Sequence, residues 1–215
     1  MLSFDMTETM NFIILTFWSL FVIVDPIGLV PAFLAMTEHN TRDDRVRMAR
    51  LASIVTFFVL VLFALAGNFI LKSFGVTVPA FEIAGGIILL KIALDMLQAR
   101  RTALKETPEE QAEGSTKDDI AVTPLAVPML AGPGAITAVV LLGQQSRDLF
   151  QTLIVITNIF LVSLITFLIL RIAAFRSSIF SAITLKILSR LMGLLLAAIA
   201  VQFILNGIQN GTSLW

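Results

Sequence analysis

One aspartate and two prolines interrupt an apolar stretch near the start of the chain. The stretch is FVIVDPIGLVPAF, residues 21–33, and a second interruption, AGPGAIT, lies at residues 131–137. Proline removes a backbone donor but suits the first position of a helix, with Asp or Gly as the preceding cap. The sequence therefore predicts that one new helix starts at Pro26 after an Asp25 cap, and another at Pro133 after a Gly132 cap.

Two such helix starts could form a binding site. Helix N-termini attract carboxylates, and the free carbonyls before each break could receive an ammonium group or a cation, so a small zwitterion would satisfy both. The alternative is that the prolines only kink the helices and that Asp25 is only a cap. The predicted substrate-binding residues are Asp25, Pro26, Gly28, Ala131, Gly132, Pro133, Gly134 and Thr137.

The composition predicts a membrane protein. Of 215 residues, 57% are hydrophobic and 14% are charged, and the mean hydropathy is +0.93. Net charge is zero, so there is no basic footprint for nucleic acid. The chain has no cysteine, one histidine and no H-E-x-x-H, G-x-S-x-G or phosphate-loop motif, so we expect no enzyme activity, cofactor or metal site. The expected surroundings are a lipid bilayer.

Six segments are long and apolar enough to cross a bilayer, and they predict an all-α polytopic fold. The positively charged residues give its orientation, because twelve lie on one side, which is then cytoplasmic, and both termini lie outside. The predicted spans are 9–36, 50–72, 79–98, 121–144, 149–170 and 186–208. The twelve residues are Arg42, Arg45, Arg47, Arg50, Arg100, Arg101, Lys105, Lys117, Arg171, Arg176, Lys186 and Arg190.

The chain divides into two similar halves. Pro26 and Pro133 are 107 positions apart, and so are Gly86 and Gly193. Each half has three spans, so the second half crosses the membrane in the opposite direction, which is the plan of many secondary transporters with helices broken at the midplane. We expect a first repeat at 1–98, a flexible cytoplasmic linker at 99–120, and a second, inverted repeat at 121–215.

Three charged residues lie within the third span. Glu82 is near its outer end, where it could reach water. Lys91 and Asp95 are four residues apart on one helix face and could form an ion pair. Because intramembrane charges are rare and often functional, Asp95 is, with Asp25, a candidate for coupling to H⁺ or Na⁺.

Several motifs resemble the MarC family of bacterial and archaeal inner-membrane proteins. They are DPIGLVPAF, IAGGI, PLAVPMLAGPGAIT and SRLMGLLLAAIAVQFILNGI, and the likeness covers the whole chain. The resemblance implies a multi-pass protein of the bacterial inner membrane and a permease for small neutral amino acids such as glycine or alanine. Many members have Asn where this chain has Asp25, which leaves the coupling ion open.

We therefore expect a secondary transporter of small neutral solutes, with its site at the two helix breaks. The alternatives are a channel or exporter for another small solute, or a regulatory or scaffold protein of the membrane without transport. The sequence does not predict the oligomeric state.

Overall fold

The described part of the chain folds into helices. The computed structural model describes residues 6–98, 121–146, 148–176 and 182–212, and these contain no strand. The predicted all-α class is therefore confirmed, while the linker predicted at 99–120 lies outside the described residues. The elements are α1 Met6–Val24, α2 Val30–Met36, α3 Arg42–Ser73, α4 Val78–Leu97, the π-helix η1 Ala121–Leu130, α7 Pro133–Gln145, α8 Leu149–Phe175 and α9 Ala182–Thr212.

Four helices among the described residues are long and apolar enough to cross a membrane. They are Thr7–Val24 of α1, Arg42–Ser73, Leu149–Phe175 and Arg190–Thr212 of α9. Large apolar side chains on their outer faces are exposed, for example Phe69 by 76% and Leu15 by 67%, as expected for surfaces that face lipid. The protein is therefore a multi-pass membrane protein.

The other two predicted spans differ from a simple apolar helix. The third corresponds to α4, which has 20 residues and contains Glu82, Lys91 and Asp95. The fourth is divided between η1, with 10 residues, and α7, with 13 residues. Neither part of this fourth segment is long enough to cross a bilayer core of about 30 Å.

Local signals in the sequence fix several helix ends. The Thr41 side chain accepts a hydrogen bond from the Asp44 N–H at 3.3 Å at the start of α3, and Asp148 does the same for the Gln151 N–H at 2.7 Å at the start of α8. At the end of α3, Gly75 takes φ +67°, and the Val76 N–H reaches the Leu71 carbonyl at 2.9 Å. This is the glycine-capped helix end that a left-handed residue makes possible.

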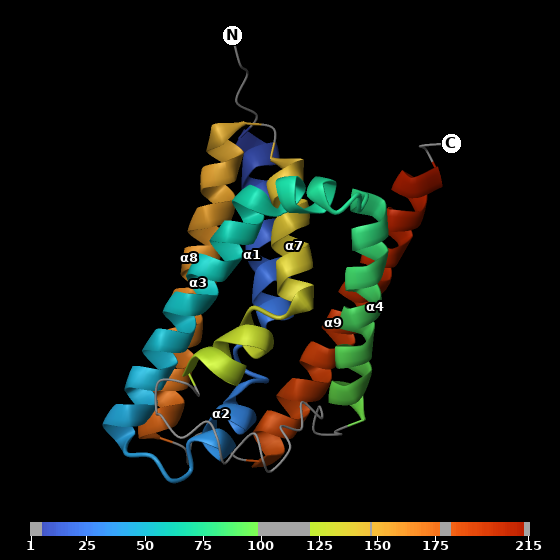
Figure 1. Cartoon of the computed structure of the whole chain (residues 1–215). Coiled ribbons are helices and arrows are strands. Elements are labelled where there is room, and N and C mark those ends of the chain that lie inside the picture. Colours follow the sequence, from blue (N-terminus) through green and yellow to red (C-terminus); the bar gives the residue numbers. More distant parts are fainter. Residues whose placement is uncertain (1–5, 99–120, 147, 177–181, 213–215) are drawn as a thin grey trace.

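The helices form two groups joined by α7 (Figure 1). Helices α4 and α9 lie side by side, as do α3 and α8, and α7 contacts α1, α3, α4 and α8. In the view of Figure 1, helices α1, α4 and α8 run from top to bottom, and α3 and α9 run from bottom to top. The start of α1 and the end of α9 therefore both lie at the top.

The contact between α4 and α9 is reciprocal. A Cβ at Gly86 of α4 would lie 2.8 Å from the Ala200 carbonyl oxygen of α9. A Cβ at Gly193 of α9 would lie 3.2 Å from the Ala93 carbonyl oxygen of α4. Ala93 and Ala200 are 107 positions apart, as Gly86 and Gly193 are. Two glycines 107 positions apart thus approach two alanines that are also 107 positions apart, one in each direction across the α4–α9 contact.

Candidate functional site at the two helix interruptions

The first interruption separates α1 from α2. Helix α1 ends at Val24, and Asp25 has φ +46°, the one positive φ among the described non-glycine residues. Aspartate tolerates this left-handed conformation better than most residues, because its short side chain can bond locally. Residues 26–29 form a turn, and the regular helix α2 begins at Val30. The helix start predicted at Pro26 is therefore wrong by four residues.

Asp25 nevertheless makes the hydrogen bonds of a helix cap. The Gly28 N–H donates to Asp25 Oδ1 at 3.1 Å, and the Leu29 N–H donates to the Asp25 carbonyl at 3.2 Å. The next backbone hydrogen bond spans three residues instead of four, from the Val30 N–H to the Ile27 carbonyl at 3.2 Å, so the turn does not continue directly as an α-helix. With seven residues, α2 also adds little helix dipole, which weakens the expectation of two equivalent helix N-termini.

The second interruption is confirmed where it was predicted. The π-helix η1 closes with a bond from the Ala131 N–H to the Ala126 carbonyl at 2.8 Å. Gly132 is the N-cap of α7, with φ −73° and ψ 171°, and Pro133 is the first helical residue. No side chain caps α7. Among the described residues, the first amide groups of this helix are therefore left without a side-chain acceptor, as a site for an anion requires.

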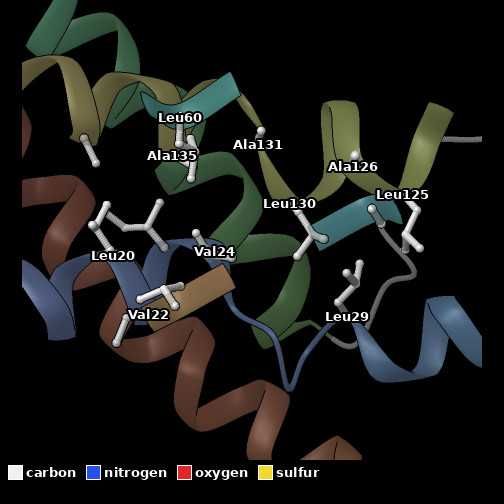
Figure 2. Close-up of a cluster of buried hydrophobic side chains, with 14 of the residues drawn as sticks. Leu20, Val22, Val24, Leu29, Leu60, Leu125, Ala126, Leu130, Ala131 and Ala135 are labelled. Carbon is white, nitrogen blue, oxygen red and sulfur yellow. The ribbon is translucent and has the colours of Figure 1, made fainter. Parts of the chain in front are cut away.

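Both interruptions border one hydrophobic cluster. Figure 2 shows Val24 and Leu29, which flank the first interruption, in the same cluster as Leu130 and Ala131 from the second. Val24, Leu130 and Ala131 are each at most 4% exposed. Residues about 100 positions apart in the sequence thus belong to one apolar interior, and α1, which ends at the first break, packs against α7, which begins at the second.

Two of the predicted site residues, Gly134 and Thr137, pack α7 against α4. A Cβ at Gly134 would run into the side chain of Leu89, and a Cβ at Gly85 would run into the side chain of Thr137. The Thr137 hydroxyl donates to the Pro133 carbonyl at 2.8 Å. Its donor is therefore used within its own helix. Both residues hold α4 close to the start of α7, which makes α4 part of the wall around the second interruption.

The charge on Asp25 has no cationic partner among the described residues. Its side chain is partly buried, and the hydrogen bond to its carboxylate comes from the Gly28 N–H. Asp95 is also partly buried, but no ion pair or hydrogen bond in the described structure joins it to Lys91 or to either interruption. The geometry therefore places Asp25 at the first break, whereas the coupling role of Asp95 stays a prediction.

Comparison with known proteins identifies the family. A sequence model described as MarC family integral membrane protein matches residues 10–212. The chain belongs to the MarC family. A UPF0056 membrane protein of Methanocaldococcus jannaschii is 39% identical to this MarC chain over 94% of its length and 88% of the relative. The UPF0056 membrane protein YvbG of Bacillus subtilis is 38% identical over 93% and 95%, and YhcE of Escherichia coli is 31% identical over 90% of each chain. No solved structure matches.

Sequence reasoning missed one residue of this MarC chain, Glu82. It was expected to reach water, but it is 4% exposed, and the Asn210 side chain of α9 donates to its Oε2 at 3.2 Å. A signal for this burial was present, because Glu82 has the helical spacing of Gly85, Gly86 and Leu89, the buried face of α4. Glu82 thus belongs to the α4–α9 contact.

Proposed function

We propose that this MarC-family protein is a secondary transporter of small neutral solutes, with its site at the two helix interruptions. Neutral amino acids such as glycine and alanine are the first candidates. The observation that carries the proposal is the Asp25 carboxylate, which lies at the end of α1 without a cationic partner in the described structure, while α1 packs against α7, the helix with an uncapped start.

The chemistry of the two breaks is complementary to a zwitterion. A carboxylate in an apolar interior is strongly destabilised unless a proton or a cation offsets its charge. The ammonium group of an amino acid, H⁺ or Na⁺ could each do so at Asp25. The uncapped amide groups at the start of α7 could receive the carboxylate of the same solute. A small side chain fits best, because apolar residues close around both breaks.

The repeat architecture supports a transporter. The reciprocal contact between α4 and α9, the common offset of 107 positions, and the opposite directions of equivalent helices in Figure 1 are what two inverted repeats of three spans would produce. In this arrangement six segments cross the membrane and the breaks in the first and fourth lie at its midplane. The arginine-rich end would then be cytoplasmic, and both termini would lie outside.

Transport is tested by counterflow of labelled alanine or glycine in proteoliposomes. Wild type should accumulate label against preloaded solute, and Asp25→Asn should change the rate or its dependence on pH or Na⁺. The matched control is Asp148→Asn, which makes the same substitution at an exposed helix cap. Uptake without counterflow would indicate a channel. No flux of any small solute would support a regulatory or scaffold protein instead.

A further inference from the structure

An open groove runs along the outer surface between α3 and α8. Its volume is about 190 Å³, and none of the residues that line it belongs to the two interruptions. Helix α3 contributes one face to it, from Arg50 to Phe58 with helical spacing, and α8 contributes Phe160, Ser163 and Phe167 among others. The rings of Phe57 and Phe160 meet edge to face with centroids 6.0 Å apart, which sets the register of the two helices. The groove is therefore largely aromatic and apolar.

Arg50 stands at the polar end of this groove. The next charged residue along α3 is Lys72, and the segment 51–71 between them is about 32 Å long, close to the bilayer core of about 30 Å. Arg50 thus lies at the boundary where lipid headgroups begin. It also lines an adjoining hollow together with Arg47. Both side chains are exposed, and Arg50 makes no ion pair within the described residues. This end of the groove suits an anion.

Ser163 provides a second polar feature, between the level of Arg50 and the rings of Phe57 and Phe160. It is 6% exposed, and its hydroxyl has no hydrogen-bond partner in the described structure. Ser53, on the α3 side, already donates to the Ala49 carbonyl at 2.9 Å. A buried hydroxyl without a partner is unfavourable, so an acceptor that enters the groove would be stabilised by Ser163.

The order of these features along the groove matches one kind of molecule. Phe57 is seven residues from Arg50, or about 10 Å along the helix axis, and Ser163 is one turn from Phe160 toward the arginine end. Phe167, seven residues from Phe160 in that direction, lies level with Arg50, so from Arg50 inward the groove offers a cation beside one aromatic ring, then a hydroxyl donor, and then the rings of Phe57 and Phe160. A glycerophospholipid presents a phosphate, an ester carbonyl and then hydrocarbon in the same order.

We propose that the α3–α8 groove binds one anionic glycerophospholipid, with its headgroup phosphate at Arg50, an ester carbonyl at Ser163 and the start of one acyl chain on Phe57 and Phe160. Cationic side chains at the membrane surface favour anionic headgroups. The site is separate from the proposed transport site, so its test does not depend on transport.

The test is native mass spectrometry of the full chain with phosphatidylglycerol and phosphatidylcholine of identical acyl chains. Wild type should retain one phosphatidylglycerol about fivefold in preference. Arg50→Gln should remove this preference, whereas Arg190→Gln, at an exposed arginine of α9, should keep it. Ser163→Ala should weaken retention of both lipids about fivefold, since both carry esters. Ser53→Ala should change neither, because its hydroxyl is already bonded.

Three results would overturn the proposal. Wild type could retain both lipids equally, Arg50→Gln and Arg190→Gln could behave alike, or Ser163→Ala could have no more effect than Ser53→Ala. A dimer that excludes lipid from the groove would show instead that a second copy of the chain covers it. Circular dichroism of each variant establishes that loss of lipid is not loss of folding.

Discussion

Replacement of Asp25 by three residues separates its structural role from its charge. Asp25 caps the Gly28 N–H at 3.1 Å and holds φ at +46°. Asparagine keeps both features and removes the charge. Glycine keeps the left-handed conformation and loses the cap, which costs a few tenths of a kcal/mol. Alanine loses the cap, at about 1 kcal/mol, and adopts the left-handed conformation at a cost of about 1–2 kcal/mol.

The expected order of stability is therefore wild type and Asp25→Asn, then Asp25→Gly, then Asp25→Ala. A total loss of about 2–3 kcal/mol for Asp25→Ala corresponds to a decrease in Tm of about 4–12 °C for a chain of this size. Circular dichroism during heating of the purified protein in detergent measures it. If Asp25→Asn loses as much Tm as Asp25→Ala, the charge itself stabilises the fold, and the claim that it has no cationic partner is wrong.

Three further predictions concern stability and use the same assay. Gly86→Ala should lower the free energy of unfolding by about 1–2 kcal/mol, because its Cβ would lie 2.8 Å from the Ala200 carbonyl oxygen. This value is the cost of overpacking minus the gain in helix propensity from glycine to alanine. Gly193→Ala, whose nearest backbone contact is 3.2 Å, should lose less, and the reverse order would contradict the reciprocal packing. Gly75→Ala should cost about 1 kcal/mol through its positive φ alone, since nothing lies within 4 Å of a Cβ there. Gly75→Asn should cost less, because asparagine tolerates the left-handed conformation better. Equal losses for the two variants would show that the positive φ is not the cause. Glu82→Gln should keep the free energy of unfolding within about 0.5 kcal/mol of wild type, because the amide oxygen can still accept from Asn210. Glu82→Ala should lower it by about 1–3 kcal/mol. Similar values for both variants would show that the hydrogen bond contributes nothing to stability.

The sequence predicted the places of the two interruptions because proline, glycine and aspartate act locally. Gly132 and Pro133 have the roles that their types suggest, as cap and first helical residue. The start of α2 was missed by four residues, because it depends on the φ of Asp25 and on a tight turn that residue types alone do not distinguish from a helix. Pro31 marks the true start better than Pro26, since it is the second residue of α2.

Helix lengths and inward faces were harder to predict. Hydropathy marks only the apolar part of a helix. The hydrogen-bonded helices extend beyond that part, so α3 already begins at Arg42 and α9 continues to Thr212. The place of Thr137 depends on how α7 packs against Gly85, which no local pattern contains. Asp95 was proposed from its charge within a span, and no hydrogen bond or ion pair of the described residues joins it to the breaks, so its role stays a prediction.

The most direct test of the central claim is whether water and solute reach the interruptions. The chain has no cysteine, so a single Ala131→Cys thiol can be probed in membranes with a small charged reagent. The control is Ala173→Cys, an equally buried alanine of α8. The account predicts modification of residue 131, slowed by alanine or glycine, and no modification of residue 173. If residue 131 is as unreactive as residue 173 from both sides of the membrane, the interruptions are closed structural kinks and do not form a transport site.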